Sequence, residues 1–206
     1  SENGRSKTEW RPLGIVNCNI KRFLLFRMAK VSYNYTRAKS LKRRQKEKKQ
    51  MNIRRANEND IPRLIELLEQ VLQIHADIRP DIFIPGTTKY TNEELAQMIK
   101  DDTRPIYVAA DENDNCLGYA FCQLQEQPFS NNMVPFTSLF IDDLCVDAST
   151  RGQHIGEKLF VHVKEEAKRL GCYEVTLNVW AGNTSAEKFY EKMGLKIKEQ
   201  QMEYIL

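Results

Sequence analysis

The sequence is poor in the residues that most often mark metal centres and disulfide frameworks. It holds three histidines, which are scattered, and five cysteines with no C-x-x-C pair and no metal-ligand spacing. We therefore expect no metal. Four of the cysteines (116, 122, 145 and 172) fall in or beside predicted strands, where a free thiol behaves as a small apolar side chain. Free thiols favour a reducing compartment, so we expect the protein to be cytoplasmic.

Long apolar runs are also missing. Short stretches such as Phe23–Phe26 are far below the roughly 20 residues that a membrane-spanning helix needs. The beginning of the chain has neither the apolar centre nor the cleavage site of a signal peptide. We expect no membrane partner.

Charge divides the chain into two parts. Residues 1–50 hold 15 Lys and Arg against 3 Asp and Glu, a net charge of +12. Residues 51–206 hold 16 against 25, a net charge of −9, so the overall +3 conceals two different segments. A basic arm on an acidic domain is one pattern of nucleic-acid or ribosome binding.

A second interpretation of residues 1–50 is favoured. This segment has no clear periodicity, whereas Met51 starts a stretch that reads as a natural first strand of a domain. Lys46-Glu47 can be encoded by a bacterial ribosome-binding sequence at a functional distance before Met51. We expect residues 1–50 to be a non-native or disordered basic extension, residues 51–206 to be the domain, and a nucleic-acid partner to be absent.

Alternating and helical periodicities follow one another along residues 136–206. A strand is predicted over 136–146, and a turn, Arg151 to Gly156, leads into a helix that Gly171 ends. A strand over 175–179 follows, and Thr184 to Glu187 reads as a capping box that opens a short helix. Residues 195–206 are predicted to be extended.

The turn before the first of these helices is a candidate anion site. Free backbone N–H groups and the positive end of the helix dipole would face a ligand there. Arg151 adds a positive charge, while Gly152 and Gly156 allow a phosphate to approach the backbone closely. Taken alone, this turn is equally compatible with a plain strand-to-helix connection.

Two motifs in this region resemble those of the GCN5-related N-acetyltransferase (GNAT) family. The pyrophosphate motif Gln/Arg-x-x-Gly-x-Gly/Ala corresponds to Arg151-Gly152-Gln153-His154-Ile155-Gly156, and Asn-x-x-Ala-x-x-Phe-Tyr-x-x-x-Gly-Phe/Leu corresponds to residues 183–195. The resemblance covers about residues 51–206. One departure is His154, which stands at the first glycine of the motif. Histidine tolerates a positive φ better than most residues. Its side chain must in addition point away from the phosphates.

The resemblance implies an α/β (α+β) fold with a central mixed, mostly antiparallel sheet of six to seven strands. About four helices would flank this sheet, and strands 4 and 5 would splay apart. The N-terminal half fits, because residues 52–56 read as a strand, Thr91 to Glu94 as a helix-capping box, and 106–125 as a hairpin. Residues 77–86, with two prolines and a glycine, would cover the acceptor site.

The same resemblance assigns acetyl-CoA as the co-substrate and names its contacts. The backbone of the fourth strand would pair with the pantetheine arm and supply the N–H donor for the oxyanion, and Asn183 would hydrogen-bond the pantetheine or the backbone. Tyr190 would be the general acid that protonates the departing thiolate. The expected cofactor-binding residues are Leu144, Cys145, Val146, Arg151, Gly152, Gln153, His154, Ile155, Gly156, Asn183 and Tyr190.

The general base stays open. An alkylammonium with an ordinary pKa of about 10.4 must lose a proton before it can attack a thioester. Relatives that acetylate protein N-termini place a Glu where this chain has Asn178, which accepts no proton. Asp142 and Asp143 are the nearest carboxylates, and strict alternation would send them to opposite faces. A base acting through water is an equal alternative, and Cys145 is a poor candidate for a nucleophile.

The sequence thus predicts an acetyl-CoA-dependent N-acetyltransferase acting on a primary amine of a small molecule, peptide or protein. The −9 charge of residues 51–206 favours a cationic acceptor. Two alternatives belong to other classes: a regulatory CoA-binding protein without turnover, and, if residues 1–50 are native, a nucleic-acid- or ribosome-associated acetyltransferase. A homodimer is also left open.

Overall fold

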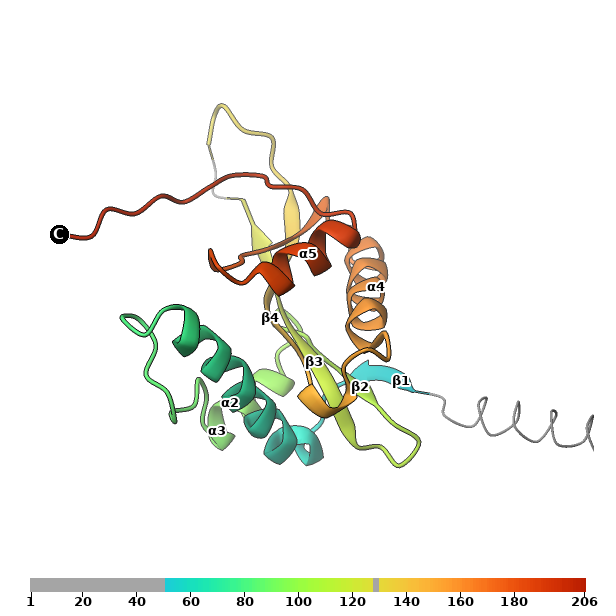
Figure 1. Cartoon of the computed structure of the whole chain (residues 1–206). Helices are drawn as coiled ribbons and strands as arrows, with labels where there is room; N and C mark the ends of the chain where they lie inside the picture. Colours follow the sequence, from blue (N-terminus) through green and yellow to red (C-terminus); the bar gives the residue numbers. More distant parts are fainter. Residues whose placement is uncertain (1–50, 128–129) are drawn as a thin grey trace, which may run out of the picture. The chain divides into compact units, whose positions relative to one another are not determined.

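The computed structural model describes residues 51–127 and 130–206, so the predicted basic extension, residues 1–50, lies outside the described part (Figure 1). The elements follow the chain in the order β1 (Asn52–Arg55), a 3-10 turn (Glu58–Asp60), α2 (Ile61–Ile78), α3 (Asn92–Ile99), β2 (Ile106–Ala110), β3 (Cys116–Glu126), β4 (Thr137–Val146), a second 3-10 turn (Ala148–Thr150), α4 (Ile155–Arg169), β5 (Glu174–Leu177) and α5 (Thr184–Lys192).

One mixed sheet organises these elements. Its strands lie in the order β1-β2-β3-β4-β5, with antiparallel neighbours from β1 to β4 and a parallel β4–β5 pair. The predicted α+β class and the hairpin between β2 and β3 are confirmed. The predicted number of six to seven strands is wrong for the described residues, which form five strands. Residues 195–206, predicted to be extended, form no strand, because alternating side chains make a strand only where a partner backbone is within reach.

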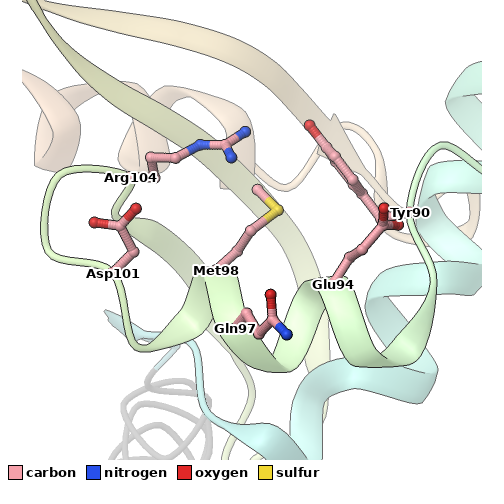
Figure 2. A pocket seen from close by; sticks show the side chains of 6 residues that line it. All are labelled: Tyr90, Glu94, Gln97, Met98, Asp101 and Arg104. Atoms are coloured by element: carbon pink, nitrogen blue, oxygen red, sulfur yellow. The ribbon is translucent and has the colours of Figure 1, made fainter.

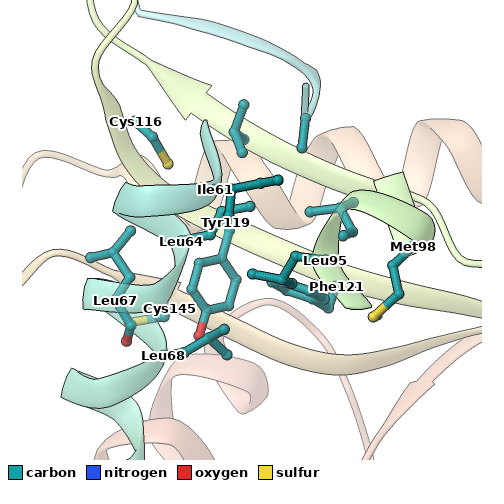
Figure 3. Close-up of a cluster of buried hydrophobic side chains, with 13 residues drawn as sticks. Ile61, Leu64, Leu67, Leu68, Leu95, Met98, Cys116, Tyr119, Phe121 and Cys145 are labelled. Carbon is teal, nitrogen blue, oxygen red and sulfur yellow. The ribbon is translucent and has the colours of Figure 1, made fainter. Parts of the chain in front are cut away.

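Helices cover both faces of the sheet, and two apolar clusters fill the space between the layers. Helices α2 and α3 pack on one face, where Leu64, Leu68 and Leu95 meet the inward side chains of β2 and β3 (Figure 3). Helix α4 packs on the other face with Leu159, Phe160 and Val163, and α5 adds partly buried side chains there. Burying both faces is the main stabilising contribution to a sheet of this kind.

Local signals in the sequence set most helix ends. The Thr91 hydroxyl accepts from Glu94 N–H at 3.2 Å, and the Glu94 carboxylate accepts from Thr91 N–H at 2.8 Å, which is the predicted capping box of α3. Helix α4 ends at Arg169, two residues before Gly171, whose φ of 74° is the left-handed conformation expected of a terminating glycine.

The predicted start of α5 is one residue out. The N-cap is Asn183, whose side-chain oxygen accepts from Ala186 N–H at 3.2 Å, and Thr184 is already helical. The capping box expected over Thr184 to Glu187 is therefore wrong. Asn and Thr are both good N-cap residues. Because Asn183 comes one residue earlier and caps the helix, the helix already includes Thr184.

A β-bulge interrupts the long β3–β4 ladder. Phe121 pairs with Asp143 and Cys122 pairs with Ile141, so Asp142 is the extra residue on β4. A bulge re-aims the side chains around it and increases the local twist of the strand. Within residues 51–127 and 130–206, no helix combines the length and apolar character needed to cross a bilayer.

Gly118 is required by the close approach of β3 to β4. A Cβ at this position would lie 2.7 Å from the backbone oxygen of Cys145, and a backbone atom cannot move aside cheaply. We expect Gly118→Ala to lower the free energy of unfolding by about 1–3 kcal/mol, as other overpacked cores do. Urea denaturation checks this value.

Gly156→Ala is the matched control, because a Cβ there would meet Phe189 at an ordinary 3.4 Å. Its effect on the free energy of unfolding should stay within about 1 kcal/mol. Equal destabilisation by the two substitutions would contradict the steric argument.

Candidate active site

The parallel ladder between β4 and β5 is much shorter than β4 itself. It runs from Ser138–Glu174 to Ile141–Leu177, whereas β4 continues to Val146. Residues 142–146 therefore keep β3 as a neighbour on one edge and have no strand on the other. We call this divergence the fork. It confirms the predicted splay between strands 4 and 5, and it leaves backbone groups of β4 available to an added extended group.

The turn after β4 presents a set of unpaired donors. None of the backbone N–H groups of residues 151–157 has a protein acceptor in the described structure, and His154 gives α4 no side-chain cap. Gly152 has a φ of 80°, and residues 151–154 are exposed. Unpaired N–H groups at the start of a long helix form the type of site that binds phosphate.

His154 takes the conformation that the missing glycine would have taken. Its φ is 60° in the left-handed region, as its place in the motif requires. Its side chain is 68% exposed, and Nδ1 lies 3.1 Å from Oε2 of Glu157. The imidazole is thus held at Glu157, and the departure from the motif does not disturb the backbone of the turn.

Contacts from three elements fix this turn in place. Asp147 accepts from Ser149 N–H at 2.9 Å and pairs with Arg63 of α2. Gln70 of α2 accepts from Ala148 N–H at 3.2 Å. At Gly156, a Cβ would lie at an ordinary contact distance from Phe189 of α5 (3.4 Å) and from Val146 of β4 (3.5 Å), so both elements border the backbone there. The donors are therefore preorganised by β4, α2 and α5 together.

Helix α5 brings Tyr190 to the fork. The Tyr190 ring packs against Phe189 at 5.0 Å and Phe160 at 6.3 Å between centroids. Burial, reinforced by the charge of Asp143, raises the pKa of the Tyr190 hydroxyl well above its ordinary value. The phenol is therefore protonated at neutral pH and close enough to Asp143 for their charges to interact. Asn183, the other motif residue here, is occupied as the N-cap of α5.

Both aspartates of the bulge lie on the same side of the sheet. The Asp142 carboxylate accepts from Lys89 Nζ at 2.8 Å and from the Tyr90 hydroxyl at 3.2 Å. The Asp143 carboxylate accepts from the Tyr119 hydroxyl at 3.0 Å. The expectation that alternation sends the two aspartates to opposite faces is wrong, because the bulge breaks the two-residue period at Asp142.

Asp143 carries the most informative change in proton affinity. Burial of its carboxyl raises its pKa to about 6, against the opposing effects of the Lys89 charge and the Tyr119 hydrogen bond, while the charge of Asp142 raises it further. The residue as a whole keeps some accessible surface. A group of this kind is partly ionised near neutrality and can exchange protons there.

The connector between α2 and α3 packs against the segment after β5. Phe83 contacts His75 at 5.1 Å and Trp180 at 5.3 Å between ring centroids, and Arg79 lies 5.8 Å from the Trp180 ring. A Cβ at Gly182 would meet Ile78 at 3.4 Å. The predicted loop over residues 77–86 is thus partly the end of α2, and its aromatic side chain borders the segment that leaves the fork.

Three residues of this site were missed by the sequence analysis: Lys89, Tyr90 and Tyr119. Lys89 and Tyr90 lie in an irregular connector, where no periodicity could connect them with β4. Tyr119 did leave a signal, because a tyrosine in an otherwise apolar strand needs a partner for its hydroxyl once it is buried. The Tyr90 ring stacks on Phe121 at 5.8 Å, which explains how the connector is fixed to the sheet.

A pocket of about 250 Å³ opens beside α3 (Figure 2). Its walls are mostly polar, and it shares one residue with the candidate site, Tyr90, whose hydroxyl donates to Asp142. None of its lining residues belongs to β4 or to the turn before α4, so we assign no part of the chemistry to it. Its lining residues are Tyr90, Glu94, Gln97, Met98, Asp101 and Arg104.

The cysteines near the sheet are unsuited to nucleophilic chemistry. Cys116, Cys122 and Cys145 are buried free thiols, as predicted, and Cys172 is partly buried. Burial raises the pKa of the Cys145 thiol to about 12, so almost no thiolate exists near neutrality. In the part of the chain that the structure describes, no group of His, Cys, Asp and Glu side chains could hold a metal ion.

The mixed sheet forks beside a helix N-terminus that has free N–H groups. This arrangement is that of the acetyltransferase fold which the two sequence motifs suggested. The model of the acetyltransferase (GNAT) family matches residues 68–195, and the chain belongs to this family.

Curated relatives are acetyltransferases of different kinds. The peptidyl-lysine N-acetyltransferase YjaB of Salmonella typhimurium is 27% identical over 149 residues, which are 71% of this chain and 84% of that protein. The glucosamine 6-phosphate N-acetyltransferase of Arabidopsis thaliana is 37% identical over 62 residues, 30% of this chain and 40% of the enzyme. The chain thus spans two fifths of the length of that enzyme.

Solved structures agree on the fold. A mutant of the BH1408 protein from Bacillus halodurans superposes with a TM-score of 0.72 and 28% identity, covering 76% of this chain and 99% of that chain. The glucosamine-6-phosphate N-acetyltransferase structure from Arabidopsis thaliana gives a TM-score of 0.56 with 25% identity, covering 76% and 98%.

The raised pKa of Asp143 predicts a pH-dependent cost to stability. Its ordinary value is 3.8, so ionisation opposes folding increasingly as the pH rises from about 4 through the folded pKa of about 6. We expect Asp143→Asn, whose amide oxygen still accepts from Tyr119, to stabilise the domain above pH 7 by about 1–2 kcal/mol. The gain should vanish near pH 4.

Urea denaturation at pH 4 and pH 8 measures this difference. Asp142→Asn is the control, because it loses the ion pair with Lys89 and should bring no stabilisation at pH 8. A gain for Asp143→Asn of the same size at both pH values would show that its ionisation is not the cause.

Proposed function

We propose that the chain transfers an acetyl group from acetyl-CoA directly to a primary amine. The observation that carries this proposal is the row of unpaired N–H groups at residues 151–157, next to the open edge of β4 in the fork. The N–H groups of residues 151–157 suit a pyrophosphate, and the backbone groups on the open edge of β4 suit the amide groups of a pantetheine arm. Bound acetyl-CoA would supply the thioester.

The residues that we assign to the cofactor follow from this arrangement. Arg151, Gly152, Gln153, His154, Ile155 and Gly156 would hold the pyrophosphate, mainly through their backbone. Leu144, Cys145 and Val146 would pair with the pantetheine arm, and one of their N–H groups would donate to the thioester oxygen as charge develops there. Asn183 would act indirectly, because capping α5 fixes the helix that carries Tyr190.

Asp143 is the proposed general base. An incoming ammonium group gives its proton to the Asp143 carboxylate, directly or through one water molecule, and its nitrogen then attacks the thioester carbon. With a pKa of about 6 this carboxyl is ionised above neutral pH and is more basic than an ordinary aspartate. Asp142 is engaged by Lys89 and Tyr90, so we assign it to electrostatic support and not to proton transfer.

Tyr190 is the proposed general acid. When the carbon–sulfur bond breaks, the Tyr190 hydroxyl donates its proton to the leaving sulfur, and the new amide nitrogen loses its second proton to solvent. The phenolate then recovers a proton from solvent, and Asp143 releases the proton that it took from the ammonium. The products are an N-acetylated amine and free CoA. Burial keeps the phenol protonated at neutral pH, and its neighbour Phe189 packs against the start of α4, where the donors lie.

The acceptor is proposed as a primary amine that carries positive charge when free. The −9 net charge of residues 51–206 would attract such a molecule, and two carboxylates lie at the bulge. A lysine side chain and glucosamine 6-phosphate, which the names of the relatives mention, both offer a primary amine. The free buried thiols suit a reducing compartment, and we propose the cytoplasm.

Regulatory CoA binding without turnover is the second candidate, and Asn178 favours it. This residue lies just past β5, is exposed and offers no base on that strand. Asp143 nevertheless offers a carboxylate on β4 for the role of base, and the His154 backbone keeps a left-handed φ of 60°. We therefore retain the enzyme as the proposal, with turnover on an amine panel, read as free thiol, as its first test.

Asp143→Asn should lower kcat by about 100- to 1,000-fold, because proton removal from the ammonium is lost. In the unchanged protein, kcat/KM for the acceptor should fall as the pH drops through about 6, where the carboxyl becomes protonated. Steady-state kinetics from pH 5 to 9 check both effects. An Asp142→Asn variant that loses more activity than Asp143→Asn would reverse the assignment.

Tyr190→Phe should lower kcat by about 10- to 100-fold and leave the affinity for acetyl-CoA nearly unchanged. Only the hydroxyl is removed, and the ring contacts with Phe189 and Phe160 stay. Kinetics with calorimetric titration of acetyl-CoA separate the two quantities. Tyr173→Phe, at a residue that is 77% exposed, is the matched control. Unchanged turnover in Tyr190→Phe would remove the acid role.

A further inference from the structure

The Tyr119 phenol lies beside the bulge and is shielded from solvent. Tyr119 belongs to β3, its relative exposure is 0%, and Figure 3 shows its ring among leucine side chains of α2 and α3. Its hydroxyl donates to Oδ2 of Asp143 at 3.0 Å. A side chain that no acceptor can touch takes no direct part in the chemistry, so Tyr119 can act on proton transfer only through Asp143.

The packing of three aromatic rings holds the Tyr119 hydroxyl in place. The Tyr119 ring meets Phe121 edge-on at 4.9 Å between centroids, and the Tyr90 ring stacks on Phe121 at 5.8 Å. Phe121 is the β3 residue that pairs with Asp143 in the ladder. Because the Tyr90 hydroxyl donates to Asp142, each of the two phenols on Phe121 serves one aspartate of the bulge. Side chains packed in a core rest in single rotamers, so both hydrogen bonds are formed before any ligand arrives.

The two oxygens of the Asp143 carboxylate have different surroundings. Oδ2 accepts from Tyr119, whereas no side chain in the described part of the protein donates to Oδ1. A carboxylate oxygen that already accepts a hydrogen bond is the poorer proton acceptor of the pair. Oδ1 is therefore the oxygen that is available to a proton.

Charged and titratable groups face Asp143 from several elements of the fold. Burial raises the pKa of its carboxyl to about 6, whereas the Lys89 charge and the Tyr119 hydrogen bond lower it, and the charge of Asp142 raises it. Burial and the charge of Asp143 raise the pKa of the Tyr119 hydroxyl well above its ordinary value, so the phenol stays protonated and can always donate. The groups are Lys89 of the α2–α3 connector, Tyr119 of β3, Asp142 and Cys145 of β4, and Tyr190 of α5.

We propose that Tyr119 is a positioning residue that holds Oδ2 of Asp143, so that Oδ1 takes the proton of the acceptor ammonium. An N–H bond of the ammonium breaks, an O–H bond forms at Oδ1, and the phenol keeps its own proton throughout. The role of Tyr119 rests on the proposed function of Asp143 as the general base. By stabilising the carboxylate form, Tyr119 also sets the pH above which that base is ionised.

The first test follows the ionisation of Asp143 in the free protein, without turnover. Aspartate is labelled with ¹³C in the carboxyl group, the Asp143 resonance is identified by its loss in Asp143→Asn, and its chemical shift is titrated from pH 4 to 9. Tyr119→Phe removes a donor that stabilises the charged form, so the pKa of Asp143 should rise by about one pH unit.

Tyr107→Phe is the matched control. Tyr107 is a tyrosine of the neighbouring strand β2 with a relative exposure of 2%, and its hydroxyl donates to the Glu166 carboxylate at 3.5 Å on the α4 face. The substitution also removes one hydroxyl that serves a carboxylate, but it does so away from the bulge. It should leave the pKa of Asp143 within about 0.2 of its native value.

A second variant keeps the proposal open to refutation if circular dichroism shows that Tyr119→Phe has lost its fold. A fluorotyrosine in place of Tyr119 preserves the ring, the hydroxyl and nearly the whole volume, while its more acidic phenol donates more strongly. The pKa of Asp143 should then fall below its native value, which is the opposite direction to Tyr119→Phe.

Steady-state kinetics test the link to catalysis. In Tyr119→Phe the acid limb of kcat/KM for the amine should move up in pH by the amount that the NMR titration moves. On the alkaline plateau, kcat should fall about 3- to 10-fold because the carboxylate is no longer held, and KM for acetyl-CoA should stay unchanged. A purely structural role would lower activity by the same factor at every pH and leave the acid limb in place.

An unchanged Asp143 titration in both Tyr119 variants would overturn the proposal by itself. A titration that moves while the acid limb stays at the native pH would also overturn it, because Asp143 would then not be the base. A native protein without turnover on any amine would instead refute the proposed acetyl transfer, and the titration would still decide whether Tyr119 controls the ionisation of Asp143.

Discussion

The short β4–β5 ladder is the constraint on which the candidate site depends. A parallel pair that ended together with β4 would use the backbone groups of residues 142–146, and nothing else could pair with them. Because the two strands diverge after Ile141, those groups stay available, and α4 begins beside them with its own unpaired donors. One divergence thus leaves both sets of donors free, and these are the groups to which we assign the acetyl-CoA.

The bulge at Asp142 positions the two carboxylates to which we assign electrostatic support and proton transfer. It places two carboxylates on the face that α2 and α3 cover, where the α2–α3 connector supplies Lys89 and β3 supplies Tyr119. The two aspartates then differ in role because their neighbours differ: an ammonium group neutralises Asp142, whereas Asp143 is buried beside a phenol. Two adjacent acids of one strand become unequal through their environment alone, which is how proton-transfer sites are commonly built.

Local signals made much of the fold predictable. The capping box at Thr91, the glycine after α4 and the hairpin between β2 and β3 depend on neighbours in sequence, and the structure confirms each of them. The two motifs with their fixed spacing also identified the turn at residues 151–156 and the helix with Tyr190. Properties that depend on pairing across the sheet were not predictable in this way. The alternation of side chains in the sequence does not predict the bulge at Asp142. It also does not predict whether residues 195–206 pair with another strand.

The buried thiols of β3 and β4 have a consequence for the dynamics of the sheet. Cys122 and Cys145 lie on opposite faces of the sheet, and burial raises the pKa of each thiol to about 12. An alkylating reagent can therefore reach them only when the layers above them separate. Each thiol therefore reports on one layer of helices. The alkylation rate of Cys145 measures how often the α2–α3 side opens, and the alkylation rate of Cys122 measures how often the α4 side opens.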